Sequence, residues 1–304
     1  MALDSKGLNP VRNRAWLLCL TILATLAGGL TAGQVAPGPP APPARIISLI
    51  PAVTEMLFAV GAGPRVVAVS SFDRFPPEVE KLARAGALLD PDVERILSLR
   101  PDLVVVYRSQ TDLLTQLERA KIPAFVYAHR GMADVTETLR QIGERVGAAA
   151  ESQRLAAEIE RRIASIREKT AKGHRPRTLI VFGRDAFALR GIYASGGVGF
   201  VHDMVTAAGG DNVFADTQRE AVQATTELII ARAPEVILEL RAEPIAADVE
   251  AKELGTWSTL SSVPAVRAQR VHIIGDARTV IPGPRIADAV ELLAGVLQRS
   301  GRQP

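Results

Sequence analysis

A pattern that occurs twice, once in each half of the sequence, is the feature that most constrains how this chain can fold. Residues 94–107 read ERILSLRPDLVVVY and residues 227–240 read ELIIARAPEVILEL, at a constant offset of 133 (227 − 94). Each copy predicts a short helix, a proline that ends it, and a strand that is apolar on both faces. A strand of that kind needs cover on both faces, which is typical of parallel α/β sheets. Although such a pattern can recur by chance, the repeat predicts two α/β lobes of similar plan with a cleft between them.

The length of the chain also favours two lobes, because 304 residues exceed the usual size of a single hydrophobic core. Between the two copies, residues 148–172 predict one long, highly charged helix. Its narrow apolar stripe consists of Leu155, Ile159, Ile163 and Ile166. Such a helix suits a stiff connection between two parallel-sheet α/β lobes. The predicted order is a signal peptide (1–33), a Pro-rich tether (34–44), an N-terminal lobe (45–147), a linker helix (148–173) and a C-terminal lobe (174–304).

The first 33 residues have the features of an export signal. Lys6, Arg12 and Arg14 precede a short apolar run over residues 15–30, and small residues follow it. A retained membrane anchor is the alternative. The only cysteine, Cys19, lies inside the apolar run, so removal of the signal leaves a chain without thiols or disulfides. We therefore expect a periplasmic or otherwise extracytoplasmic location.

Charge and motif patterns argue against several classes of function. The formal net charge of +3 falls to +1 (3 − 2) without the charges of residues 1–33, and no basic stripe follows, so nucleic acid is not an expected partner. The glycines of residues 196–199 lack the third spaced glycine of a phosphate loop. The four histidines are scattered, without the spacing of a zinc site. We expect a binding protein with no catalytic residues, bound metal or cofactor of its own.

Several aromatic and charged side chains follow predicted strands, where ligands bind in open α/β sheets. This combination suits a flat or amphipathic ligand with carboxylate, amide or phosphate edges. The residues expected at these strand ends are Phe72, Tyr107 with Arg108, Tyr127, Arg184, Asp276 and Arg278.

Glu94 and Glu227 occupy the same position in the two copies of the repeat. Each lies one residue off the apolar stripe of its predicted helix, in the first turn, and should face solvent. One explanation is that acidic residues stabilise helix N-termini by about 0.3–1 kcal/mol. The explanation we favour is a matched pair of anionic contacts, one on each lobe, for a two-fold symmetric partner with basic sockets.

Several longer motifs resemble the vitamin B12-binding proteins of bacterial ABC importers, within the wider class of iron-complex and cobalamin periplasmic binding proteins. Residues 45–61 (RIISLIPAVTEMLFAVG) and 69–78 (VSSFDRFPPE) carry the first half of the resemblance, and residues 257–271 and 282–285 the second. The resemblance implies a monomer of two α/β lobes joined by one long helix, with a small-molecule metal chelate between them. It also implies that the two repeat glutamates contact arginines on the two subunits of an ABC permease dimer.

The resemblance implies a ligand of the cobalamin type, with some departures. Phe72 matches one aromatic of the cobalamin binders and Tyr107 stands where another is expected, but two expected tryptophans are absent, and their positions fall near Leu88 and near Ala221. Haem or an iron–siderophore chelate is therefore the alternative ligand. Two alternative functions are an extracytoplasmic tetrapyrrole chelatase and a sensor that takes no part in transport. The side chains that could bind iron are Tyr107, Tyr127, Tyr193 and His202. Residues 184–200 are expected to form the wall of the second lobe, with Arg190 and Tyr193 as ligand contacts.

Overall fold

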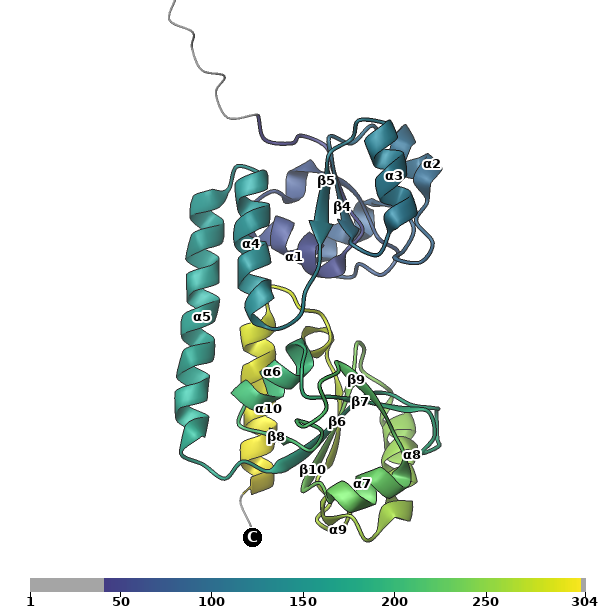
Figure 1. The fold of residues 1–304 in the computed structure, drawn as a ribbon, viewed down its shortest axis with the longest axis vertical. Coiled ribbons are helices and arrows are strands. Elements are labelled where there is room, and N and C mark those ends of the chain that lie inside the picture. Colours follow the sequence, from purple (N-terminus) through teal and green to yellow (C-terminus); the bar gives the residue numbers. More distant parts are fainter. Residues whose placement is uncertain (1–40, 302–304) are drawn as a thin grey trace, which may run out of the picture. The chain divides into compact units, whose positions relative to one another are not determined.

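The structure is a computed structural model that describes residues 41–301 (Figure 1). The predicted signal segment (1–33) lies outside the described residues, as does most of the predicted tether. No helix within residues 41–301 is long and apolar enough to cross a membrane.

The first lobe is built on a five-stranded parallel sheet with the strand order β3-β2-β1-β4-β5. Its strands are β1 (Ile46–Ser48), β2 (Val66–Val69), β3 (Ala83–Arg84), β4 (Leu103–Tyr107) and β5 (Ala124–Tyr127). Its helices are α1 (Pro51–Ala59), α2 (Val93–Ser98), α3 (Thr111–Arg119) and α4 (Ala133–Arg145), with short 3₁₀ turns at Gly63–Arg65 and Pro77–Lys81.

Both faces of this first sheet are covered by helices, as the doubly apolar strand of the repeat predicts. In β4, Leu103 and Val105 belong to a buried cluster that includes residues of α1 and α4. Val104 and Val106 belong to a second cluster that includes residues of α2 and α3. Figure 1 shows the two helix pairs on opposite sides of β4 and β5.

The second lobe contains a six-stranded sheet with the order β11-β10-β6-β7-β9, in which β8 also pairs with β6. Its strands are β6 (Arg177–Gly183), β7 (Ile192–Ser195), β8 (Asp211–Asn212), β9 (Ala221–Ala224), β10 (Val236–Arg241) and β11 (Val271–Gly275). Its helices are α6 (Phe200–Ala207), α7 (Thr226–Arg232), α8 (Ala247–Trp257), α9 (Pro264–Arg267) and α10 (Ile286–Gly301), with 3₁₀ turns at Ser258–Leu260 and Ala277–Thr279.

The second sheet is mixed, which differs from the wholly parallel sheet expected from the sequence. β10 is parallel to β6 and β11, but β7 is antiparallel to both β6 and β9. The reason is the connection over residues 184–191, which contains no helix. Antiparallel neighbours can be joined by a short loop, whereas parallel ones need a crossover of a dozen or more residues.

The long connecting helix α5 (Ala149–Ala171) follows the predicted stripe: Ala156, Ile159, Ile163 and Ile166 are buried. At 1.5 Å per residue its 23 residues span about 35 Å. These side chains belong to one apolar cluster that also contains residues of α1 and α4 in the first lobe and of α6 and α10 in the second. The fold is therefore two α/β lobes joined by a long helix that packs against both.

Candidate ligand-binding site

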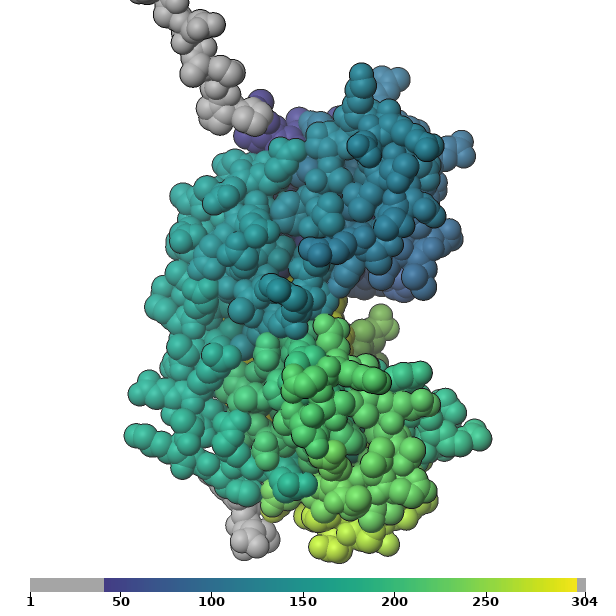
Figure 2. Space-filling model, in the orientation of Figure 1, coloured from purple at the N-terminus to yellow at the C-terminus, as the bar shows by residue number. Residues whose placement is uncertain are grey.

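The two lobes meet at the carboxyl ends of their central strands. In Figure 1, β4 and β5 run toward the second lobe, and Figure 2 shows the surface hollowed between the blue first lobe and the green second lobe. Because ligands of open α/β sheets bind beyond the carboxyl ends of the strands, this cleft is the candidate site.

A buried ion pair links the lobes at the base of the cleft. Arg285, which precedes α10, donates to both carboxylate oxygens of Glu55 in α1, at 2.9 and 2.6 Å. The Arg285 guanidinium also lies 3.8 Å from the ring centre of Phe75. Burial raises the pKa of Glu55, and the bonds from Arg285 oppose that shift. A second link is the bond from the Met132 amide to Asp203 in α6, at 2.9 Å.

The first-lobe wall of the cleft contains a cavity of about 400 Å³ that is lined mainly by apolar side chains. Phe72 and Tyr107, the two aromatics expected to contact the ligand, both line it. Phe72 is 67% exposed although it is a large apolar residue. Leu88, near the position of an expected tryptophan, lines the same cavity. Its lining consists of Leu49, Ile50, Pro51, Ser70, Phe72, Ala87, Leu88, Leu89, Asp90 and Tyr107.

A second cavity, of about 350 Å³, is lined by residues of both lobes. His129 comes from the first lobe, whereas Phe182, Glu220, Ala221 and Val280 are among those from the second. Ala221 lies near the other position where the family resemblance implies a tryptophan.

Tyr107, Tyr127 and His129 form a cluster beside these cavities. The Tyr107 hydroxyl and His129 Nδ1 are 2.8 Å apart. Tyr127 stacks on the His129 ring with a centroid distance of 5.6 Å, and its buried hydroxyl has no hydrogen-bond partner among residues 41–301. Burial lowers the pKa of His129 and raises the pKa of both tyrosines. The imidazole is thus neutral near pH 7, and its Nδ1 can accept the Tyr107 proton.

On the second lobe, Arg190 and Tyr193 are exposed, as the expected contact role requires, together with Phe187. Arg190 forms only a long ion pair with Asp185, at 3.8 Å. Arg184 differs from this expectation, because its side chain is only 1% exposed and is paired with Glu239 and Glu253. A ligand in the cleft could not reach this guanidinium without breaking those pairs.

Asp276 and Arg278 lie together just after β11 and bind each other. Arg278 Nε donates to both Asp276 oxygens, at 2.9 and 3.0 Å. The Arg278 guanidinium holds the pKa of the Asp276 carboxyl below its usual range. Both side chains are half-buried, so the pair presents a polar surface with little free charge.

Residues 46–277 match the family described as periplasmic binding protein. The chain belongs to the periplasmic binding protein family. Members of this family bind solutes, so the protein is a binding protein rather than an enzyme.

Individual members of the family point to related ligands. An uncharacterized ABC transporter substrate-binding lipoprotein of Bacillus subtilis is 30% identical over 83% of this chain and 79% of its own length. A vitamin B12-binding protein of Pectobacterium carotovorum is 30% identical over 64% of this chain and 71% of its own length. Among solved structures, a periplasmic heme-binding protein of Roseiflexus is 28% identical, with a TM-score of 0.73 over 85% of this chain and 99% of the other.

In this periplasmic binding protein, Glu94 and Glu227 are both exposed in the first turns of α2 and α7. The two helices begin in the same way: the Asp92 side chain accepts from the Arg95 amide and the Thr225 hydroxyl accepts from the Leu228 amide. The repeat thus places one solvent-facing carboxylate at the equivalent point of each lobe.

Sequence reasoning missed two residues that line the cavity between the lobes, His129 and Glu220, and it also missed Arg241 at a strand end of the second lobe. His129 was passed over because the search for histidines relied on sequence spacing, yet it follows β5 by two residues. Arg241 ends β10 and Glu220 directly precedes β9. The signal that could have identified these residues is their position next to the end of a strand. The sequence analysis considered the ends of only some of the strands.

Proposed function

We propose that this protein is an extracytoplasmic solute-binding protein that captures cobalamin or a related corrinoid and delivers it to an ABC importer. The observation that carries the proposal is the apolar cavity that Phe72 and Tyr107 both line. An exposed aromatic side chain in an otherwise apolar cavity is costly in water and is typical of a site that stacks on a ligand. Family membership and the vitamin B12-binding relative support the same conclusion.

Affinity in this proposal comes from stacking and from burial of the apolar wall. Each aromatic contact adds about 0.5–1.5 kcal/mol beyond the area that it buries. Polar edges of the ligand would meet the charged groups of the second-lobe rim, where Arg190 is exposed. The ion pair between Glu55 and Arg285 and the long helix α5 hold the two walls at a set separation. A preformed cleft loses little conformational entropy when it binds.

Delivery would use Glu94 and Glu227, which we propose contact arginines on the two subunits of a permease dimer. Their exposure and their equivalent positions in the repeat support this role. Because exposed ion pairs are individually weak, two matched contacts on separate lobes would act mainly to orient the protein on its partner.

A second candidate ligand is haem or another iron chelate, and the hydrogen bond between Tyr107 and His129 favours it. A tyrosine binds ferric iron as its phenolate, so the hydroxyl must lose a proton. Burial raises the pKa of Tyr107, which opposes that loss, but neutral His129 lies 2.8 Å away and can accept the proton. The heme-binding relative from Roseiflexus supports this alternative.

Titration of the mature chain with cyanocobalamin, hemin and a ferric hydroxamate siderophore, followed by absorption and calorimetry, tests the proposal. We expect one-to-one binding of cyanocobalamin with a dissociation constant in the micromolar range or below. A hemin complex with a phenolate-to-iron charge-transfer band, formed in preference to cyanocobalamin, would favour the second candidate. Failure to bind any of the three chelates would refute the proposed function.

A further inference from the structure

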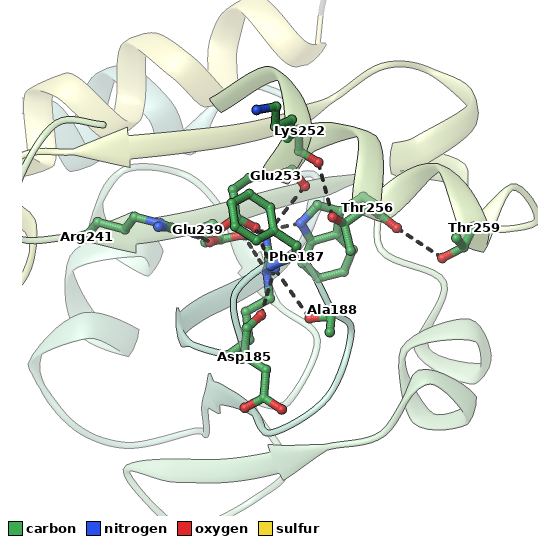
Figure 3. A network of polar contacts seen from close by, with 11 residues as sticks. Asp185, Phe187, Ala188, Glu239, Arg241, Lys252, Glu253, Thr256 and Thr259 are labelled. Atoms are coloured by element: carbon green, nitrogen blue, oxygen red, sulfur yellow. Dashed lines mark hydrogen bonds and ion pairs between the residues drawn. The ribbon is translucent and has the colours of Figure 1, made fainter. Parts of the chain in front are cut away.

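A network of charged side chains lies at the carboxyl ends of β6 and β10, on the second-lobe side of the cleft (Figure 3). Its members are two arginines, two glutamates and one tryptophan: Arg184, Arg241, Glu239, Glu253 and Trp257. Glu239, Glu253 and Trp257 are buried. Two positive and two negative charges make the network neutral, which is the condition under which buried charges are tolerated.

The glutamates of this network have their hydrogen-bonding capacity well filled. Glu239 Oε2 accepts from Arg184 Nε at 3.0 Å and from Trp257 Nε1 at 3.2 Å, while its Oε1 accepts from Arg241 Nε at 3.0 Å. Glu253 pairs with Arg184 and with Arg241 and also accepts from the Phe187 amide. Because these bonds already occupy the two carboxylates, we do not expect either of them to bind a ligand.

The two arginines differ in how much of the guanidinium is used. Arg184 bonds through all three nitrogens and is fully enclosed. Arg241 bonds through Nε and Nη2, and its Nη1 takes part in none of the hydrogen bonds or ion pairs among residues 41–299. Its side chain is 28% exposed. The Nε and Nη2 donors of Arg241 are therefore held by buried carboxylates, and Nη1 alone is open.

Arg241 lines a cavity of about 210 Å³ together with Phe182 and Gly183. Arg184, Glu239 and Glu253 of the network line the same cavity. Phe182 also lines the larger cavity that His129 reaches from the first lobe. The backbone of Arg241 is held as well, since its carbonyl accepts from the Asp276 amide at 2.9 Å. An arginine that is fixed in this way keeps its Nη1 ready to donate a charge-assisted hydrogen bond to a carboxylate, at little cost in conformational entropy.

We propose that Arg241 is a specificity-determining residue that binds a free carboxylate on the edge of the ligand. The inference rests on the proposed function, because it places a chelate in the cleft. Within that function it favours chelates that carry ionised carboxylates, such as haem or a carboxylate-bearing corrinoid, over cyanocobalamin, whose acid side chains are amides. Glu239 and Glu253 act through Arg241 as positioning residues, and Arg184 is their buried counter-ion.

The test compares hemin, which has two free propionates, with hemin dimethyl ester, in which both propionates are methylated and uncharged. Loss of Arg241 alone would leave two buried carboxylates with one arginine, so the variant to use is Arg241→Gln with Glu253→Gln, which keeps the network neutral. The matched control is Arg140→Gln with Glu160→Gln, an ion pair between α4 and α5 whose arginine is similarly exposed, at 25%. Thermal unfolding of each variant reports whether it is folded.

We expect the wild-type protein and the control to bind hemin about 10-fold or more tightly than its ester, since a hydrogen bond to a charged group contributes on this scale. The Arg241 variant should bind both equally. An unchanged preference in that variant, or a wild-type protein without the preference, would overturn the inference. A wild-type protein that binds only cyanocobalamin would also overturn it while leaving the proposed function intact. A protein that binds no chelate would refute both.

Discussion

Replacement of Arg285 by alanine should destabilise the protein strongly, and the size of the effect follows from the geometry of its partner. The Glu55 side chain is 2% exposed and receives two charge-assisted hydrogen bonds from Arg285, at 2.9 and 2.6 Å. Without Arg285 the carboxylate would be buried with no counter-ion bonded to it. Breaking a buried ion pair in this way costs about 3–5 kcal/mol. Loss of the contact between Arg285 and the Phe75 ring adds about 0.5–2 kcal/mol.

The cost should depend on pH, and its sign follows from the pKa of Glu55. Burial already raises this pKa, and removal of Arg285 takes away the hydrogen bonds that oppose the shift. A carboxyl group whose pKa is raised in the folded state is least destabilising below its unfolded pKa, near 4.5, and most destabilising above its folded pKa. The loss of stability caused by Arg285→Ala should therefore be large at pH 7 and much smaller near pH 4.5.

Chemical and thermal unfolding of the mature chain at pH 4.5 and pH 7 would measure this difference. For a chain of this size, about 3–5 kcal/mol corresponds to a fall in melting temperature of roughly 6–20 °C. Glu55→Gln in the same variant should restore much of the loss at pH 7, because no buried charge remains. A loss of stability that is the same at both pH values, or that Glu55→Gln does not reduce, would refute this account of the bridge between the lobes.

Four further predictions concern the cleft and the docking residues. Phe72→Ala should weaken cyanocobalamin binding about 10-fold or more in calorimetry and leave the melting temperature nearly unchanged, because the ring is exposed before the ligand binds; an unaltered affinity would remove Phe72 from the site. Tyr107→Phe should weaken hemin binding and leave cyanocobalamin binding within about 3-fold, since the ring is kept and only the hydroxyl is lost; an equal loss for both ligands would argue against iron coordination. Glu94→Ala combined with Glu227→Ala should abolish uptake by a reconstituted importer at unchanged ligand affinity, and a large loss of affinity would contradict the docking role. Burial lowers the pKa of His129, so the contribution of this residue to stability is present above about pH 6.5 and declines as the pH falls below that value. His129→Gln should therefore make stability depend less on pH on the acid side. An unchanged dependence of stability on pH would contradict this.

Much of the fold could be predicted from the sequence because the informative patterns are local. The strands β4 and β10 of the repeat both lie in the interior of their sheets, as strands that are apolar on both faces should. Three of the four predicted stripe residues of α5, Ile159, Ile163 and Ile166, are buried and Leu155 is partly buried, because the helical period decides which side chains share a face. The same reasoning predicted that Glu94 and Glu227 face solvent. The antiparallel strand β7 was missed because its partners depend on a loop path that carries no such period.

The candidate site was predicted less completely, as the arginines show. Arg184 and Arg241 both stand at the ends of central strands, and the sequence offers no reason to assign one to the interior and the other to the cleft. The difference arises because Glu239 and Glu253, from β10 and α8, enclose one guanidinium and leave Nη1 of the other open. The pairing of Tyr107 with His129 likewise requires the neighbouring ends of β4 and β5 to be placed side by side.

The sequence by itself determined the two-lobe plan, the connecting helix and the exposure of the repeat glutamates, because hydrophobic periodicity and helix signals act over a few residues. Only the tertiary structure decided which charged and aromatic groups are free to meet a ligand. That outcome depends on partners far apart in the chain, such as Glu55 and Arg285, and on whether burial leaves each group with its hydrogen bonds filled or open.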